Sequence, residues 1–313
     1  MFRVILISIG LLFNSIVLAE TGTRIVVGAG PSGTTDYLAR YIATKLSSQT
    51  NDPAIVENKP GSMGRIASDI VKKGSGNRLV IGIEGTSNFI LVPLVDAKKT
   101  DKQPIYPRVV ATIALANQLI VVHPSFPGKN LAEFIALARK QKNINIGTSG
   151  VGGIKHLILE HVNSVYKIDI NHVPYKTSSG YIQETISGQI DGAIADEPST
   201  TNLLQSGKLR GIAILSARRT MRLPNIPTAI EQGLDLVEPV YWAITVPINT
   251  PSEIITSIRS KFQDISLSSD FIPMLTRVGL SPLLLNTFEL ENLIASDRAK
   301  WSKIIANSQV KFE

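Results

Sequence analysis

The chain has 313 residues, 43% of them hydrophobic and 18% charged, which is enough for about two domains with substantial cores. It has no cysteine, which excludes disulfides, iron–sulfur clusters, thiolate zinc sites and a lipid-anchoring cysteine. Its net charge is +7, but the cations are dispersed and not interleaved with aromatic residues, which argues against a nucleic-acid surface and suits an anionic ligand.

Residues 1–19 have the pattern of a secretory signal peptide. Arg3 supplies the positive charge, residues 4–17 are largely apolar, and Val17-Leu-Ala19 suits cleavage before Glu20. The apolar stretch is short and interrupted by polar residues, so an uncleaved membrane anchor fits it less well. We therefore expect a protein that is exported to the periplasm and is soluble after cleavage.

Strand-like and helix-like patterns alternate along the rest of the chain, which is typical of an α/β fold. In the first part we predict strands at 24–27, 54–57 and 79–84, and helices at 37–46 and 65–72. The polar stretch 96–107 is expected to be an exposed loop. The apolar run 109–122 is too long for one ordinary strand and is interpreted as a crossing between two domains.

The second part continues the alternation. We predict strands at 144–146, 189–195, 209–215 and 241–246, and helices at 130–140, 154–165, 253–266, 270–278 and 288–307. Asn130 is the predicted N-cap of the first of these helices.

A glycine loop, Gly28-Ala-Gly-Pro-Ser-Gly33, follows the first predicted strand and opens a helix. Such a junction directs backbone N–H groups and the positive end of a helix dipole at one point, which suits an anion. The loop also matches the G-x-G-x-x-G of dinucleotide-binding folds, with Glu57 where an acid that grips ribose would lie. However, Asp36 and Tyr37 stand where that helix should carry small residues. We interpret the loop as an anion-binding loop, with an exported FAD- or NAD-binding oxidoreductase as the alternative.

A second glycine loop, Gly147-Thr-Ser-Gly-Val-Gly-Gly153, follows the strand predicted at 144–146. Ser149 lies in the context of a nucleophile elbow, but Val151 stands in place of the second glycine of G-x-S-x-G. The loop also lacks the Lys-Ser/Thr of a P-loop. We expect the Thr148 and Ser149 hydroxyls and the neighbouring N–H groups to donate to a carboxylate.

Histidines and carboxylates add little evidence for catalysis. His156 and His161 are five residues apart and face different ways on a helix, which disfavours a zinc pair. His156 is either an orienting group for the second loop or an ordinary packing histidine. Asp196 and Glu197 are adjacent in an extended segment and point in opposite directions, so they make a poor catalytic pair. Asp196 is expected to accept a hydrogen bond from a ligand hydroxyl or amine.

Read together, these segments resemble the Bug-type periplasmic solute receptors of tripartite tricarboxylate transporters. The stretches that carry the resemblance are residues 31–40, 56–64, 85–87, 147–150, 156–157, 172–176, 187–191, 223–228, 231–233, 246–247 and 250–251. They cover nearly the whole chain after the signal segment, in the family's order.

The resemblance implies a two-lobed α/β periplasmic binding protein, type II-like and of the Venus-flytrap kind. With crossings near 109–122 and 240–247, it implies a two-strand hinge. The expected division is a signal peptide at 1–19, a discontinuous lobe 1 at 20–115 and 246–313, and lobe 2 at 116–245. The implied function is binding of a small organic carboxylate between the lobes and its delivery to membrane permease subunits. The protein is expected to be a monomer without catalysis, cofactor or metal; a carboxylate sensor for a signalling partner is a further alternative.

The resemblance also implies that the two glycine loops hold the carboxylate through backbone N–H groups and ordered water. The candidate ligand-binding residues are Gly30, Pro31, Ser32, Gly33, Thr34, Thr35, Asp36, Thr86, Ser87, Thr148, Ser149, Gly150, Val151, His156 and Asp196. The chain departs from the family at Gly28-Ala29, where a Pro–aromatic pair is usual, and at Ser32-Gly33, where two glycines are usual. The resemblance therefore implies a carboxylate site but no particular ligand.

Overall fold

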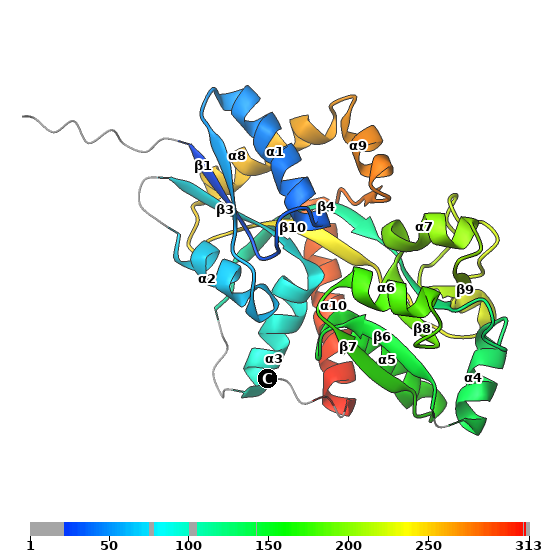
Figure 1. Cartoon of the computed structure of the whole chain (residues 1–313). Helices are drawn as coiled ribbons and strands as arrows, with labels where there is room; N and C mark the ends of the chain where they lie inside the picture. Colours follow the sequence, from blue (N-terminus) through cyan, green and yellow to red (C-terminus); the bar gives the residue numbers. More distant parts are fainter. Residues whose placement is uncertain (1–21, 75–77, 100–104, 142, 309, 311–313) are drawn as a thin grey trace, which may run out of the picture.

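The computed structural model describes residues 22–74, 78–99, 105–141, 143–308 and 310, and it contains two β-sheets that lie side by side with helices around each (Figure 1). This arrangement confirms the predicted two-lobed α/β fold class. The predicted signal segment, 1–19, falls outside the described residues.

The first sheet has six strands in the order β11-β4-β10-β3-β1-β2. Their bounds are β1 Thr23–Val27, β2 Ala54–Asn58, β3 Leu79–Gly85, β4 Arg108–Ala116, β10 Val240–Val246 and β11 Ser281–Pro282. β1 pairs in parallel with β2 and β3, whereas β10 is antiparallel to both β3 and β4. The late strand β10 therefore lies in the middle of a sheet built from the first part of the chain.

The second sheet has five strands in the order β7-β6-β8-β5-β9. Their bounds are β5 Gln118–Val122, β6 Asn145–Ser149, β7 Asn171–Tyr175, β8 Gly192–Asp196 and β9 Arg210–Ile214. β6 is parallel to β7 and β8, and β5 is antiparallel to β8 and β9. Every residue of β5 is buried, because helices cover both faces of this sheet.

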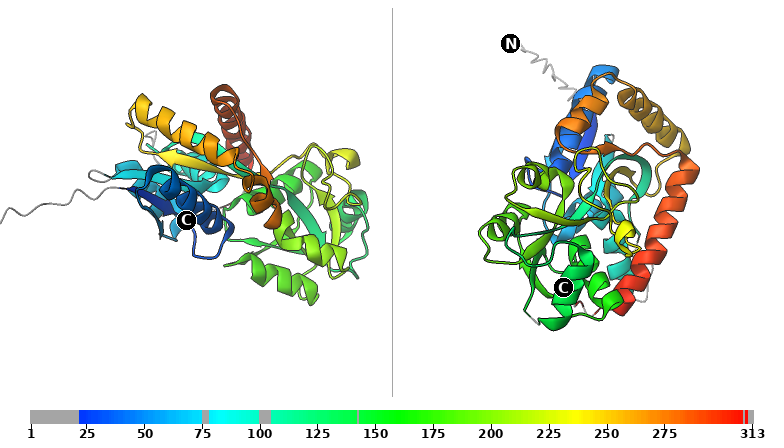
Figure 2. Two further views of the ribbon diagram at one scale, coloured as in Figure 1. Left: turned by 90° about the horizontal axis from the view of Figure 1, so that it is seen from above. Right: turned by 90° about the vertical axis from the view of Figure 1, so that its right-hand side faces the viewer.

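The helices cover the two sheets on both faces. Their bounds are α1 Thr34–Thr50, η1 Ser62–Gly64, α2 Arg65–Lys73, η2 Ser87–Leu91, α3 Val92–Lys99, α4 Leu131–Lys140, α5 Ile154–Tyr166, α6 Ser178–Ile186, α7 Glu197–Gln205, η3 Ile230–Gln232, α8 Ser252–Ser266, α9 Phe271–Arg277 and α10 Thr287–Asn307. α1 and α8 pack side by side on one face of the first sheet, and α2 packs on the other (Figures 1 and 2).

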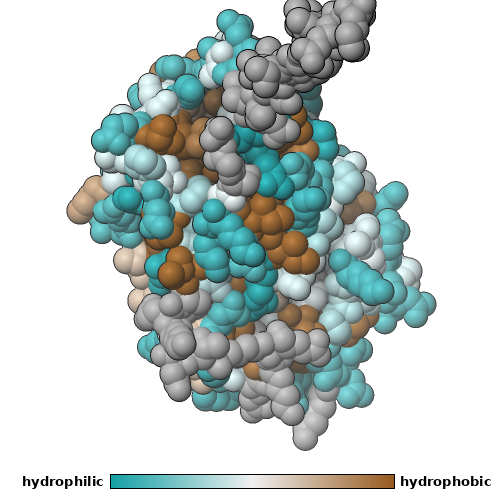
Figure 3. Space-filling model, turned by 90° about the vertical axis from the view of Figure 1, so that its left-hand side faces the viewer, coloured by the Kyte–Doolittle hydropathy of each residue, from teal (hydrophilic) through white to brown (hydrophobic). Residues whose placement is uncertain are grey.

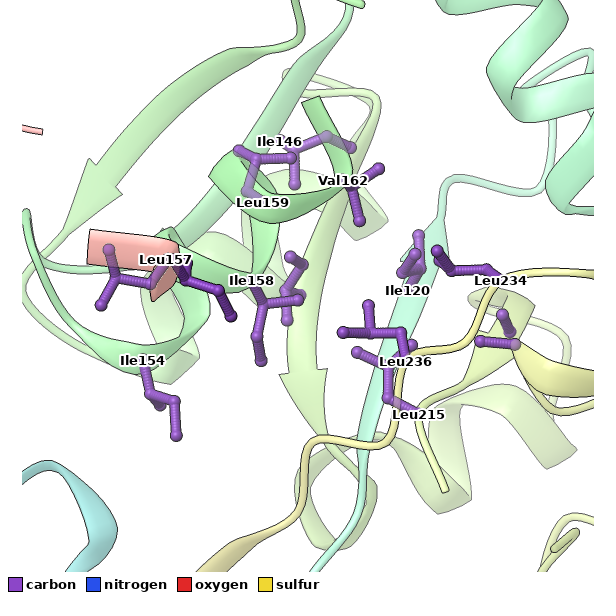
Figure 4. Packing of buried hydrophobic residues seen from close by; sticks show 14 of the residues in the cluster. Ile120, Ile146, Ile154, Leu157, Ile158, Leu159, Val162, Leu215, Leu234 and Leu236 are labelled. Carbon is purple, nitrogen blue, oxygen red and sulfur yellow. The ribbon is translucent and has the colours of Figure 1, made fainter. Parts of the chain in front are cut away.

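The core of the second sheet follows the alternation of side chains along β5. Leu119 and Val121 point toward α6 and α7, whereas Ile120 and Val122 point toward α4 and α5. Figure 4 shows Ile120 in the cluster that α5 covers. The same cluster extends to α3 and α10, and α10 packs against both β4 of the first sheet and α5.

Most predicted elements are confirmed to within a few residues, including the N-cap of α4, where the Asn130 side chain accepts from the Glu133 N–H. The predicted loop at 96–107 is wrong at its start, because α3 continues to Lys99; residues 100–104 fall outside the described ranges. Val92 and Val95 are buried and Arg65 pairs with Asp96 at 2.5 Å, so tertiary contacts stabilise helix in a polar segment. Strand β7 and helices α6 and α7 were not predicted.

Across the described ranges, no helix combines the length and apolar character needed to cross a membrane. On the face shown in Figure 3, hydrophobic residues form separate patches among hydrophilic ones.

Candidate functional site

The sheet edges that carry the two glycine loops are connected directly by the chain. β4 ends at Ala116 and β5 begins at Gln118, so one residue, Asn117, separates the sheets. β4 ends at the edge where β1 and β3 end, because β10 is antiparallel to both β3 and β4. β5 begins at the edge where β6 and β8 end, because it is antiparallel to β8. Both loops therefore lie at the edges that this crossing joins.

Asp36 braces the first loop, residues 28–33. Ser32 has φ of 68°, in the left-handed region, and its N–H donates to Asp36 Oδ2 at 3.0 Å. Asp36 is 3% exposed and also accepts from Arg40 Nε at 2.9 Å and Asn58 Nδ2 at 2.9 Å. The Arg40 hydrogen bond is the main cause that lowers the pKa of Asp36, and it outweighs the opposing effect of burial. The carboxylate thus holds the loop in shape.

Two glycines of this loop have different surroundings. A Cβ at Gly28 would lie 2.9 Å from the Cα of Gly64, so Gly28 is required for close packing between the loop and the start of α2. A Cβ at Gly30 would meet no described atom within 4 Å. Residues 31–33 are exposed as well. Gly30 therefore borders open space, where a ligand could approach the backbone.

The start of α1 is tied to β10. Trp242 Nε1 donates to Thr35 Oγ1 at 2.9 Å, so the Thr35 hydroxyl keeps its own proton for another acceptor. Thr86 is buried; its hydroxyl donates to the Tyr241 carbonyl at 3.1 Å and accepts from the Tyr241 N–H at 2.8 Å. The Thr86 hydroxyl therefore links β3 to β10, and Ser87, half-buried, begins η2 beside it.

The second loop contains two glycines in left-handed conformations, Gly150 with φ of 72° and Gly152 with φ of 75°. The Gly150 N–H donates to the Tyr175 carbonyl at 3.0 Å, and the Gly152 N–H donates to His156 Nδ1 at 3.0 Å. Val151, between them, is 48% exposed. His156 thus orients the loop from the helix that follows it, which corresponds to the first of the two interpretations offered for this residue.

His156 is part of a buried polar chain. Its ring stacks on His172, with centroids 3.6 Å apart and planes inclined by 14°. His172 Nε2 lies 2.7 Å from the hydroxyl of buried Thr148. Burial lowers the pKa of His156 to about 4, and burial with the neighbouring His156 lowers that of His172 to about 4. Both rings are therefore neutral at pH 7, and His156 Nδ1 can accept the loop N–H.

Asp196 ends β8 and has partners on both carboxylate oxygens. Oδ2 lies 2.7 Å from Lys155 Nζ, and Oδ1 accepts from Gln118 Nε2 at 2.6 Å. The Lys155 side chain is 7% exposed and that of Asp196 24% exposed. Burial opposes the charged lysine, but the charge of Asp196 outweighs it and raises the pKa of Lys155 above its ordinary value. Lys155 is therefore charged at pH 7.

Sequence reasoning missed Lys155, Gln118 and the role of His172. Lys155 carried a signal, because it is a cation in the first turn of a helix whose first two turns are otherwise mostly apolar. Gln118 and His172 carried none, since their partners are distant in the chain. Ser149, in the second loop, is the last residue of β6.

The features that suggested a dinucleotide site are used for other contacts. Glu57 accepts from Arg24 Nε at 2.7 Å and from Arg24 Nη2 at 2.8 Å, an ion pair between β1 and β2 that lowers the pKa of the carboxyl. Gly28 packs against Gly64. Among the described residues, no group of three or more histidine, aspartate and glutamate side chains is arranged to hold a metal ion.

Comparison with known proteins gives consistent matches over most of the chain. Residues 38–310 match the family model described as tripartite tricarboxylate transporter family receptor. Protein BugT of Bordetella pertussis is 24% identical over 298 residues, which cover 93% of this chain and 90% of BugT. A solved structure described as a periplasmic transporter is 26% identical, with a TM-score of 0.80 over 95% of this chain and 100% of its own. An adipate-bound protein of R. palustris is 25% identical, with a TM-score of 0.79 over 94% of this chain and 99% of its own.

Proposed function

This chain belongs to the receptor family of tripartite tricarboxylate transporters, and from that membership we propose that it binds a small organic carboxylate between its two sheets and delivers it to membrane permease subunits. The family is described as one of receptors, which favours binding over catalysis. The observation that carries the proposal is the family match over residues 38–310; the adipate in a relative 25% identical supports a carboxylate as ligand.

The two sheets are proposed as the two lobes. Lobe 1 would contain the six-stranded sheet and lobe 2 the five-stranded sheet, with crossings at Asn117 and just before Val240. The pairing of β10 with β3 and β4 favours a second crossing before β10, a few residues earlier than position 246. A ligand that contacts both lobes only when they are closed would shift the population toward closure.

The ligand carboxylate is proposed to lie between the two glycine loops. The backbone N–H groups of Gly30, Gly33 and Thr34, the Thr35 hydroxyl, Ser87, and the backbone N–H groups of residues 149 and 151 would supply hydrogen bonds directly or through water. The open space at Gly30 and at Gly150 supports this placement. Asp36, Thr86, Thr148 and His156 are proposed to position these groups, because their side chains are occupied by the contacts described above.

The ligand class is tested by thermal shift of the chain that begins at Glu20. The panel contains mono-, di- and tricarboxylates together with neutral sugars, amino acids and phosphate. We expect a carboxylate to raise the melting temperature by several degrees at saturating concentration, because ligand that binds only the folded state stabilises it. Stabilisation by sugars or phosphate alone would refute the ligand class.

Export and delivery are tested in cells. We propose that residues 1–19 direct export and are removed, so the amino-terminal sequence of protein from the periplasmic fraction should begin at Glu20. Deletion of the receptor should abolish uptake of the stabilising carboxylate through the permease. Unchanged uptake, together with loss of a transcriptional response to the carboxylate, would indicate a sensory role instead.

A further inference from the structure

Three side chains form a polar cluster at the edge of the second sheet, beside the second glycine loop. Lys155 comes from the first turn of α5, Asp196 from the end of β8 and Gln118 from the start of β5. Lys155 Nζ also lies 5.9 Å from the centre of the Tyr181 ring. Since Lys155 lies two residues after Gly153, the last residue of the loop, and precedes the loop-orienting His156, this Lys155 cluster belongs to the same edge as the candidate site.

Stability alone does not explain a charged pair at this position. Removing two charges from water carries a large cost, and well-packed apolar residues of similar size are often as stabilising as a buried ion pair. The pair is also not fully enclosed, because Asp196 retains 24% of its side-chain exposure at the sheet edge while Lys155 is nearly covered. The Lys155 ammonium lies 2.7 Å from the partly exposed Asp196 carboxylate and therefore sets the charge at this edge of the sheet.

Gln118 contributes a second, independent observation. Its Nε2 is used by Asp196, but its Oε1 is buried and has no hydrogen-bond partner among the residues that the structure describes. Gln118 is 0% exposed. A buried acceptor without a donor costs free energy, which a bound molecule carrying a hydroxyl, or a water brought with it, would recover.

The charges of the cluster discriminate between ligand groups. Each oxygen of Asp196 already accepts one hydrogen bond, and the Lys155 cation compensates its charge, so the carboxylate attracts a ligand ammonium group less than an unpaired aspartate would. A hydroxyl or a second carboxylate could instead accept from Lys155 and, for a hydroxyl, donate to Gln118. We propose that the Lys155 cluster is a specificity-determining subsite that accepts a hydroxyl or carboxylate on the ligand and rejects an ammonium group. This inference rests on the proposed carboxylate receptor function and specifies its substrate class as non-aminated carboxylates.

The test uses ligands that differ in one group. Succinate, malate and aspartate share a four-carbon skeleton, and adipate and 2-aminoadipate share a six-carbon skeleton. Affinities are measured by calorimetry for wild type, Lys155→Gln, Asp196→Asn and Lys155→Arg. Lys140→Gln, an exposed lysine at the end of α4, is the matched control for loss of one positive charge.

We expect wild type to bind the non-aminated ligand of each pair at least about ten times more tightly than the aminated one, because like charges at short range are strongly unfavourable. Lys155→Gln should reduce that ratio about tenfold, since it leaves Asp196 uncompensated, and Asp196→Asn should increase it. Lys155→Arg should retain the preference. If the cluster were only structural, each substitution would weaken the binding of both ligands equally and leave the ratio of their affinities unchanged.

The outcomes separate the two proposals. If carboxylates bind wild type but the ratio is unaffected in both Lys155→Gln and Asp196→Asn, the subsite is wrong and the receptor function stands. Should Lys155→Gln not fold, Asp196→Asn decides alone, because its ratio must rise. If wild type binds no carboxylate, the proposed function fails and the subsite fails with it. Tight binding of aspartate or 2-aminoadipate to wild type would also overturn the subsite.

Discussion

Two glycines of the first loop should respond in opposite ways to an added methyl group. At Gly28, a Cβ would lie 2.9 Å from Gly64 Cα and 3.3 Å from Ala67 Cβ, so Gly28→Ala must separate the loop from α2. Overpacking of this kind lowers the free energy of unfolding by about 1–3 kcal/mol. At Gly30, φ is not positive and the space is open. Gly30→Ala should therefore raise the free energy of unfolding by about 0.4–1 kcal/mol, because alanine lowers the conformational entropy of the unfolded chain.

The assay combines urea unfolding, followed by circular dichroism, with calorimetric titration of the carboxylate that stabilises wild type. Gly30→Ala should fold normally yet bind more weakly, and Gly30→Leu should lose at least about tenfold in affinity, because its side chain fills the space that the ligand needs. Gly28→Ala should unfold at a lower urea concentration than wild type. If Gly30→Leu binds as wild type does, the first loop does not contact the ligand. A neutral Gly28→Ala would refute the packing argument itself.

Three further predictions concern the groups that hold the loops. His156→Phe keeps a ring against His172 but removes the acceptor of the Gly152 N–H, so the free energy of unfolding should fall by about 1–3 kcal/mol and the exchange of that amide should accelerate. Asp36→Asn should cost about 1.5–3 kcal/mol in urea unfolding, whereas the exposed control Asp52→Asn should cost little; equal losses would contradict the bracing role. Acid should destabilise the protein through the two histidines. Folding lowers the pKa of each ring from 6.5 to about 4, so their contribution to the free energy of unfolding is complete above pH 6.5 and declines toward pH 4. In His156→Phe the free energy of unfolding should still depend on pH in this range, because His172 still titrates.

Local features of this protein could be predicted from the sequence because they depend on near neighbours. The two glycine loops, the N-cap at Asn130 and the apolar periodicity of most strands and helices involve residues within a few positions of one another. The long apolar run at 109–122 likewise indicated a crossing, and the structure divides it at Asn117 between two sheets. Family resemblance extended this local information to the two-lobed fold.

Contacts between distant segments were decided only by the tertiary structure. Thr35 and Trp242 are 207 residues apart, and Lys155 and Asp196 are 41 apart, yet each pair forms a hydrogen bond at the candidate site. A pattern of hydrophobicity shows which face of an element is buried but not which residue of another element meets it. The sequence therefore determined where the loops lie, and packing of the sheets and helices determined which side chains hold them and which remain open to a ligand.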